Sequence, residues 1–270
     1  MVQRERSLDR FSLAVDVGNT FTRFGVFDGE ELAHTWCATT LPVLTVDEAH
    51  AMLREFFEIR GIARGHRDGE ISHAIVSSVV PPLTDVWVRA ARAVVGCRPL
   101  VVGPGLKSGL RMRFDDPGEV GSDRIADMVA AKELFGYPLI VIDFGTTTNF
   151  EVLDRDGSFS GGIIAPGLRL SLQALSSAAA KLSMVELAAP ASTVGRNTRA
   201  AVQSGAVLGE VARIDGLIDM IWEELGYVGD VVMSGSDAGA LSALCRHEVT
   251  VEPDLTLLGL GLLERANRRR

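Results

Sequence analysis

The sequence predicts an α/β protein in which two halves repeat one plan. Short apolar runs alternate with stretches that carry the periodicity of helices. The same strand–loop–strand pattern occurs twice, and helical segments follow each occurrence. Strands mixed with helices on both sides of a duplication favour two α/β halves.

The first copy of the pattern covers residues 12–36. An apolar run over 12–17 ends in Gly18-Asn19-Thr20, and a second apolar run follows over 22–27. The next pair, Asp28-Gly29, is a strong signal for a hairpin because both residues tolerate the backbone of a tight turn. We therefore expect three consecutive strands here.

The second copy covers residues 138–166. The apolar run 139–142 leads into the loop 143–148, which reads Asp-Phe-Gly-Thr-Thr-Thr, and a strand is expected over 149–153. Asp156-Gly157 then repeats the hairpin signal. Both copies thus place an Asp-x-Gly-polar-Thr loop between strands.

Helical patterns separate and follow the two copies. Residues 46–59 carry apolar side chains on one helix face, and Thr45 with Glu48 forms a candidate capping box. Helices are also expected over 125–134 and 198–225. The turn-rich segment 136–138 marks a boundary. We expect an N-terminal half over 12–136, a C-terminal half over 137–265, and tails over 1–11 and 266–270.

Composition excludes several classes of function. The chain has 270 residues, 47% of them hydrophobic, which suffices for packed cores, and a net charge of −8, which disfavours a nucleic-acid surface. Its three cysteines match no metal spacing and fit a reducing compartment. The sequence shows no secretion signal and no apolar stretch of the ~20 residues that a membrane helix needs. We expect a cytoplasmic protein without nucleic-acid or membrane partners.

The two Asp-x-Gly loops have the chemistry of a phosphate site. Gly18 and Gly145 allow the backbone to approach a charged ligand, and the neighbouring threonines can donate to phosphate oxygens. Asp16 and Asp143 can hold cations, because hard cations prefer oxygen ligands. One such loop alone is more often an ordinary turn, but two in the same context favour phosphate binding. No Walker loop and no Gly-x-Gly-x-x-Gly motif after a strand occurs.

Repeated loops of this kind resemble those of the actin, hexokinase and acetate-kinase superfamily, and further motifs narrow the resemblance. In order along the chain, these motifs are similar to those of type III pantothenate kinases. They are Asp16–Thr20, Asp115-Asp116-Pro117, Val120-Gly121-Ser122-Asp123-Arg124, Asp143–Thr148, Gly161–Gly167, Gly195–Thr198 and Leu255–Leu260. The resemblance covers nearly the whole chain from about residue 12.

This resemblance implies two duplicated ribonuclease-H-like (actin-like ATPase) half-domains with the active site in the cleft between them. It implies ATP-dependent phosphorylation of pantothenate to 4'-phosphopantothenate, the first step of coenzyme A biosynthesis. The implied cofactors are ATP with Mg²⁺, and K⁺ or NH₄⁺. The implied partners are pantothenate and a second copy of the chain in a homodimer.

The resemblance also assigns roles to residues. Asp123 is the implied general base, and Asp143 the implied ligand of the monovalent cation. Asp16 is expected to bind Mg²⁺ through the phosphates. The substrate-binding set is Gly121, Ser122, Asp123, Arg124, Phe114 and Thr198, the last of these contributed across the dimer interface. The ATP and phosphate set is Asp16, Val17, Gly18, Asn19, Thr20, Phe21, Thr22, Arg23, Gly145, Thr146, Thr147 and Thr148.

Structural alternatives stay open for these residues. Asp123 and Arg124 could be an ion pair at a helix start, and Thr198 could be a plain helix N-cap. A diverged relative stays open because the sequence departs from the family pattern at several positions: Phe114, Asp116, Thr147, Asn149, Glu151 and the segment 234–237. That relative would be a kinase of another small hydroxy metabolite or a non-catalytic nucleotide-binding regulator.

Overall fold

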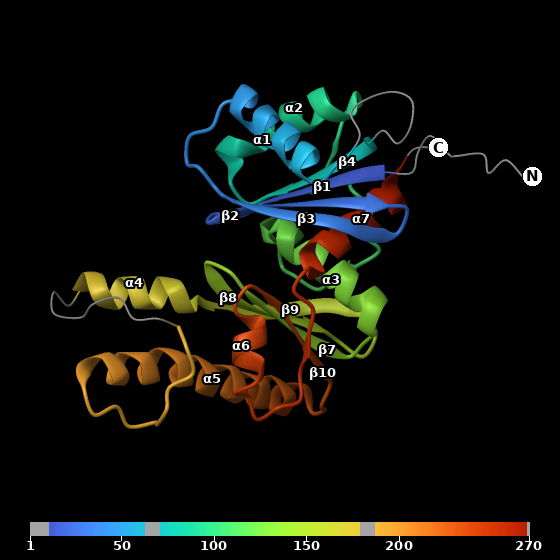
Figure 1. The fold of residues 1–270 in the computed structure, drawn as a ribbon. Coiled ribbons are helices and arrows are strands. Elements are labelled where there is room, and N and C mark those ends of the chain that lie inside the picture. Colours follow the sequence, from blue (N-terminus) through green and yellow to red (C-terminus); the bar gives the residue numbers. More distant parts are fainter. Residues whose placement is uncertain (1–10, 63–70, 179–186, 269–270) are drawn as a thin grey trace, which may run out of the picture. The chain divides into compact units, whose positions relative to one another are not determined.

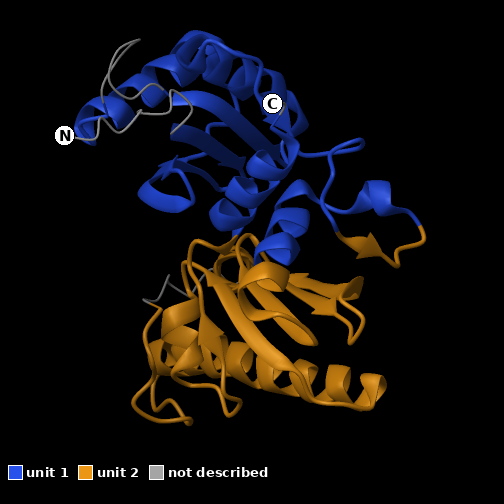
Figure 2. Cartoon of the chain, turned by 90° about the vertical axis from the view of Figure 1, so that its right-hand side faces the viewer, with its two compact units in different colours: residues 1–109, 116–130, 256–270 blue, residues 110–115, 131–255 orange. Residues whose placement is uncertain are grey.

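The structure is a computed structural model that describes residues 11–62, 71–178 and 187–268 (Figure 1). The chain divides into two compact units that do not follow sequence order (Figure 2). Unit 1 comprises residues 1–109, 116–130 and 256–270, and unit 2 comprises residues 110–115 and 131–255. The tail expected over 1–11 lies outside the described residues except for Phe11, which begins the first strand.

Unit 1 contains a mixed five-stranded sheet in the order β3-β2-β1-β4-β5. The first three strands form an antiparallel meander, whereas β4 lies parallel to β1 and to β5. The strands are β1 Phe11–Val17, β2 Phe21–Asp28, β3 Glu31–Thr39, β4 Ile71–Ser78 and β5 Leu100–Val101.

Helices cover both faces of this sheet (Figure 1). α1 (Val46–Ile59) and α2 (Pro81–Val95) pack on one face, where Phe24, Phe56 and Trp87 form the centre of the core. The other face is packed against α7 (Leu255–Asn267) and the start of α3 (Ser122–Phe135). A short 3-10 turn, Pro117–Glu119, precedes α3.

The capping box at the start of α1 is confirmed. The Thr45 hydroxyl accepts from the Glu48 N–H at 3.2 Å, and the Thr45 N–H donates to the Glu48 carboxylate at 2.8 Å. The sequence analysis did not predict α2, which begins with the pair Pro81-Pro82. Proline fits the first turn of a helix because the N–H groups there have no intrahelical acceptor.

Unit 2 contains a mixed six-stranded sheet in the order β11-β10-β7-β8-β9-β6. Strands β7, β8 and β9 form an antiparallel meander, and β10 lies parallel to β7. The strands are β6 Arg111–Met112, β7 Leu139–Phe144, β8 Thr147–Leu153, β9 Ser158–Pro166, β10 Asp230–Gly235 and β11 Thr250–Val251.

One face of the unit 2 sheet is covered by helices. α5 (Thr198–Leu225) buries Val207, Val211, Ile214 and Ile218 in a core with side chains of the sheet. α4 (Leu168–Ala178) lies beside α5, and α6 (Ala238–Ser242) follows β10 (Figure 1).

The two units share a plan, so the α/β prediction is confirmed. In each, a three-strand meander is extended by a parallel strand beside its first strand: β4 beside β1, and β10 beside β7. The loop between the first two strands is the Asp-x-Gly loop in both cases. Among the described helices, none is long and apolar enough to cross a membrane.

Candidate functional site

The start of α3 presents Asp123 on a rigid support. The helix begins at Ser122, three residues before the start expected from the sequence, so Asp123 lies in its first turn. The Asp123 Oδ1 atom accepts a hydrogen bond from the Arg124 N–H at 2.8 Å. The Asp123 carboxylate lies close beside Gly121: a Cβ atom on Gly121 would be 2.4 Å from the Asp123 Oδ1 atom, so a side chain there would displace the carboxylate. The backbone therefore holds this carboxylate in one place.

Burial raises the pKa of Asp123 above its ordinary value of 3.8. The Arg124 N–H and the Arg124 charge oppose this shift, but desolvation of the carboxylate is the larger effect. A carboxylate with a raised pKa is a stronger base, which suits proton abstraction from a hydroxyl.

A row of buried hydroxyls joins Asp123's helix to Asp16. The Ser122 Oγ accepts from the Ser78 N–H at 3.0 Å and lies 2.9 Å from the Ser77 Oγ. Ser77 in turn donates to the Asp16 Oδ1 at 2.8 Å. The ends of β1 and β4 and the start of α3 are thereby locked together. Sequence reasoning missed Ser77, because its position beside Asp16 depends on the register of β1 with β4.

The first Asp-x-Gly loop is a tight turn closed by its own backbone. The Gly18 N–H donates to the Phe21 carbonyl at 3.0 Å, and a Cβ on Gly18 would lie 2.9 Å from that oxygen. The side chains of Asn19, Thr20 and Phe21 are exposed. Thr40 fastens the turn from β3's end by donating to the Gly18 carbonyl at 2.7 Å.

Three members of the expected phosphate set are buried, whereas the tips of the two loops are exposed. Val17 and Thr22 are buried, and the Thr22 hydroxyl lies 2.9 Å from the Thr40 hydroxyl. Thr148 has no exposed surface, and its hydroxyl donates to Glu210 at 2.9 Å. These side chains stabilise the loops from behind, so their burial argues against direct side-chain contacts with phosphate.

The second Asp-x-Gly loop is braced by the turn at the start of α4. The Gly145 N–H donates to the Thr147 carbonyl at 2.9 Å, and the Gly167 N–H donates to the Thr146 carbonyl at 3.1 Å. A Cβ on Gly167 would lie 2.6 Å from two carbonyl oxygens of the loop. Gly145 and Thr146 are exposed. The loop thus lies beside the N-terminus of α4, where a helix favours anions.

Asp143 lies at the end of β7 between two other polar residues of the sheet. Asn149 is opposite it on β8 and Ser234 on β10, and strand register places all three side chains on one face. The Asn149 Oδ1 and Ser234 Oγ atoms are buried and have no hydrogen-bond partner among the described residues. In the described part of the chain, no group of three or more His, Cys, Asp or Glu residues is arranged to hold a metal.

An ion pair joins the loop after β10 to α4. Asp237 Oδ1 lies 2.9 Å from the Arg169 guanidinium, and both residues are next to the turns that flank the Thr146 loop. Gly235, with φ of 92°, passes so close to the Phe144 carbonyl that a Cβ would not fit.

Phe114 belongs to the short segment 110–115, which pairs with β9 through β6. Its ring contacts Phe159 edge-on with the ring centroids 4.8 Å apart. Arg113 holds the same segment by ion pairs to Asp154 at 3.1 Å and Asp156 at 2.6 Å. A hydrogen bond from Ser158, together with the charges of Arg111 and Arg113, lowers the pKa of Asp156 to about 2.

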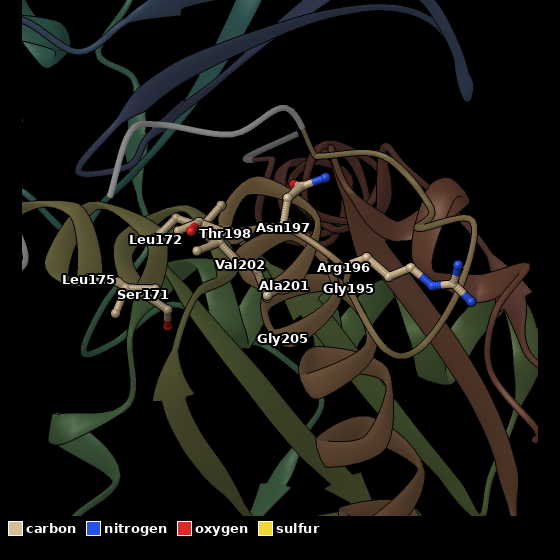
Figure 3. Close-up of a pocket in the computed structure, with 11 residues that line it drawn as sticks. Ser171, Leu172, Leu175, Gly195, Arg196, Asn197, Thr198, Ala201, Val202 and Gly205 are labelled. Atoms are coloured by element: carbon tan, nitrogen blue, oxygen red, sulfur yellow. The ribbon is translucent and has the colours of Figure 1, made fainter. Parts of the chain in front are cut away.

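Thr198 is the first residue of α5, and the N-cap is its neighbour Asn197. The Asn197 Oδ1 accepts from the Ala200 N–H at 2.9 Å, so the interpretation of Thr198 as the N-cap is wrong. Thr198 instead lines a pocket of about 820 Å³ between α4 and α5 (Figure 3). Its wall is largely apolar, with Leu172, Leu175 and Val202.

Comparisons with known proteins identify the family of this chain. The profile of the family described as "Type III pantothenate kinase" matches residues 12–220. A type III pantothenate kinase of Anaeromyxobacter sp. (strain K) is 40% identical over 256 residues, which cover 95% of this chain and 99% of that protein.

Two solved structures share the fold. One is described as a conserved putative Baf family transcriptional activator from Campylobacter jejuni, with a TM-score of 0.56 and 17% identity over 94% of this chain and 98% of that one. The other is the ethanolamine utilization protein EutJ from Carboxydothermus hydrogenoformans, with a TM-score of 0.53 and 18% identity over 94% and 89%. Identities this low show the fold alone. The profile match and the full-length relative show more: this chain belongs to the type III pantothenate kinase family.

Proposed function

We propose that this protein transfers the γ-phosphoryl group of ATP to the primary hydroxyl of pantothenate. The product is 4'-phosphopantothenate, and the step is the first of coenzyme A biosynthesis. The observation that carries this proposal is Asp123, a partly buried carboxylate with a raised pKa on a braced helix start. It lies within a sequence block that the family shares.

Asp123 acts as the general base in this proposal. Its carboxylate accepts the proton of the pantothenate hydroxyl as that oxygen attacks phosphorus, and the oxygen's bond to phosphorus replaces the bond to ADP. Arg124 binds the pantothenate carboxylate, because a guanidinium matches a carboxylate in shape and charge. Gly121 and Ser122 shape the backbone around both groups.

The nucleotide is held by backbone N–H groups and exposed hydroxyls of the two Asp-x-Gly loops. Those groups belong to Asn19 and Thr20 of the first loop and to Thr146 and Thr147 of the second, because the N–H groups of Gly18 and Gly145 already donate within their own loops. Asp16 holds Mg²⁺ on the phosphates, and the Ser77 hydroxyl orients its carboxylate. Mg²⁺ supplies charge neutralisation on the phosphoryl group. The hydroxyls of Thr22 and Thr148 are left out of this set, since both are buried.

Asp143 holds the monovalent cation, K⁺ or NH₄⁺. Two neighbouring oxygen atoms support this assignment. The buried Asn149 Oδ1 and Ser234 Oγ atoms lie on the same face of the sheet as the Asp143 side chain and have no hydrogen-bond partner among the described residues. A large, weakly hydrated ion accepts such a set of oxygens together with one carboxylate. Buried polar atoms without partners are costly, and a bound cation removes that cost.

The active form is a homodimer, in which Thr198 of one subunit contacts pantothenate bound to the other. The pocket beside Thr198 is open and apolar, and nearby Leu170, Leu175 and Val194 are exposed. Apolar surface of this kind favours association.

Coupled release of ADP tests the proposed function. Purified protein is assayed with Mg²⁺-ATP, K⁺ and either pantothenate or a panel of related hydroxy acids. Turnover with pantothenate above that with every other acid supports the proposal. Turnover with another acid alone indicates a diverged kinase. ATP binding without turnover on any acid indicates a nucleotide-binding regulator.

A further inference from the structure

Glu210 and Arg213 form an ion pair on the face of α5 that covers the unit 2 sheet, with Glu210 buried and the Arg213 side chain 27% exposed. They are one helical turn apart, and Glu210 is 5% exposed. One Glu210 oxygen accepts from Arg213, and the other accepts from the Thr148 hydroxyl at 2.9 Å. A charged pair therefore stands where α5 otherwise presents the apolar residues Val207, Val211 and Ile214.

The end of the Arg213 side chain reaches two backbone segments at once. Its Nη2 atom donates to the Pro166 carbonyl at 2.8 Å and lies 3.4 Å from the Thr148 hydroxyl. Thr148 directly follows the loop Gly145–Thr147, and Pro166 directly precedes Gly167, which bonds to Thr146. Arg213 thus ties together the two arms that support the loop.

A structural role alone does not explain this pair. An ion pair with a buried carboxylate contributes little net stability compared with apolar residues of similar volume, and in some proteins such pairs fix the arrangement of the groups they contact. Here those groups are the strand end behind the Thr146 loop and the turn that braces the loop. The geometry indicates that the pair selects one conformation of the loop.

We propose that Glu210 and Arg213 are positioning residues for the nucleotide. They touch no phosphate, but they hold the Thr146 loop so that its exposed N–H and hydroxyl groups are pre-arranged to bind phosphate. This inference rests on the proposed nucleotide role of Gly145–Thr147. Without the pair, the loop must be ordered when ATP binds, and that ordering weakens nucleotide affinity.

Four variants of the full-length protein test the proposal. Arg213→Met removes the charge and keeps the length, Arg213→Lys keeps the charge, and Glu210→Gln keeps the shape. Arg246→Met is the matched control, because Arg246 also pairs with a buried carboxylate of α5, Asp215, at 3.2 Å, and its other ion pair is with Asp219 of the same helix. The probe is Mg²⁺-ATP, and its affinity is measured by calorimetry beside the melting temperature and the KM values of ATP and pantothenate.

We expect Arg213→Met to weaken Mg²⁺-ATP binding about 10-fold or more, the loss typical of one charge-assisted hydrogen bond. The KM for pantothenate stays near that of the unchanged protein. Arg213→Lys recovers much of the affinity. The Arg213 Nη2 atom donates to both Glu210 and the Pro166 carbonyl, and a lysine ammonium can replace it as a donor. Glu210→Gln shows an intermediate loss.

The proposal is overturned if Arg213→Met lowers the melting temperature as the Arg246→Met control does but binds Mg²⁺-ATP within about twofold of the unchanged protein. It is also overturned if the unchanged protein does not bind Mg²⁺-ATP. If Arg213→Met does not fold, Glu210→Gln decides by the same comparison, because the proposal expects it to bind Mg²⁺-ATP more weakly than the unchanged protein. The unchanged protein could bind Mg²⁺-ATP, and the variants could bind it in the expected order, without any turnover of pantothenate. That result would reject the proposed function and leave this inference standing.

Discussion

At the scale of single residues, Asp123 carries the proposed chemistry, and its neighbours explain its properties. Gly121 leaves room for the carboxylate, and the Arg124 N–H fixes one of its oxygens. Asparagine in its place keeps the size but cannot accept a proton. We expect Asp123→Asn to lower kcat by about 10²–10⁴-fold, with Mg²⁺-ATP affinity almost unchanged.

Asp85→Asn serves as the control for this change, because Asp85 is an exposed carboxylate of α2 that pairs with Arg89 on the same helix. It should leave kcat unaltered. Normal turnover by Asp123→Asn would remove Asp123 from the role of base.

The raised pKa of Asp123 makes a prediction about pH. The base works as the carboxylate, so kcat/KM should fall on acidification as Asp123 is protonated, with a midpoint above the ordinary 3.8. The folded state holds this proton more tightly than the unfolded state, so charging Asp123 costs stability as pH rises through its pKa. Asp123→Asn should therefore melt no lower than the unchanged protein at neutral pH.

A pH profile of kcat/KM at constant ionic strength, with melting temperatures at each pH, measures both effects. An acid limb at or below the ordinary aspartate value, or a marked loss of stability in Asp123→Asn, would contradict the assignment.

At the scale of elements, the two Asp-x-Gly loops depend on close backbone contacts that only glycine permits. In Gly167→Ala, the new methyl group would lie 2.6 Å from the Gly145 and Thr146 carbonyls, so the loop has to move. We expect weaker Mg²⁺-ATP binding in this variant, measured by calorimetry, because the donors of the loop are displaced.

Thr45→Ala is the matched comparison, since it removes the capping box of α1 in unit 1. Losing an N-cap costs about 1 kcal/mol of stability. We expect a lower melting temperature without any change in nucleotide affinity. Equal affinities in Gly167→Ala and the unchanged protein would show that the loop does not bind phosphate in the way proposed.

Elements differed in how well the sequence predicted them. The strands beside the Asp-x-Gly loops and the capped helix α1 follow from patterns within about a dozen neighbouring residues. α2 was missed because a proline pair is compatible with both a strand end and a helix start. The caps and register-dependent partners, such as Asn197 and Ser77, required the fold.

At the scale of the whole molecule, the proposed cation and the proposed dimer make independent predictions. Asp143, with Asn149 and Ser234 beside it in the sheet, should require a large monovalent cation. We expect higher turnover in K⁺ or NH₄⁺ than in Na⁺ at matched ionic strength and saturating Mg²⁺. Asn149→Leu should reduce the response to K⁺. Equal rates in the three salts would count against Asp143 as a cation ligand.

The dimer prediction concerns the pocket beside Thr198. Light scattering at micromolar concentration should give the mass of two chains, 28.9 kDa each. Leu175→Asp in the pocket wall should shift the protein toward the monomer and lower activity together, since Thr198 would lose its place in the partner's site. A fully active monomer would remove both the dimer and the role of Thr198 across it.

By itself, the sequence determined the α/β class, the duplication, the family and the block that contains Asp123. These properties depend on short stretches of neighbouring residues, so local backbone preferences and the spacing of motifs are enough to predict them. Only the tertiary structure decided which groups meet. Ser77 binds Asp16 from 61 residues away, and Glu210 engages the Thr148 hydroxyl from 62 residues away. Such partners depend on strand register and on which face of α5 packs on the sheet, and both are set by burial of the whole core.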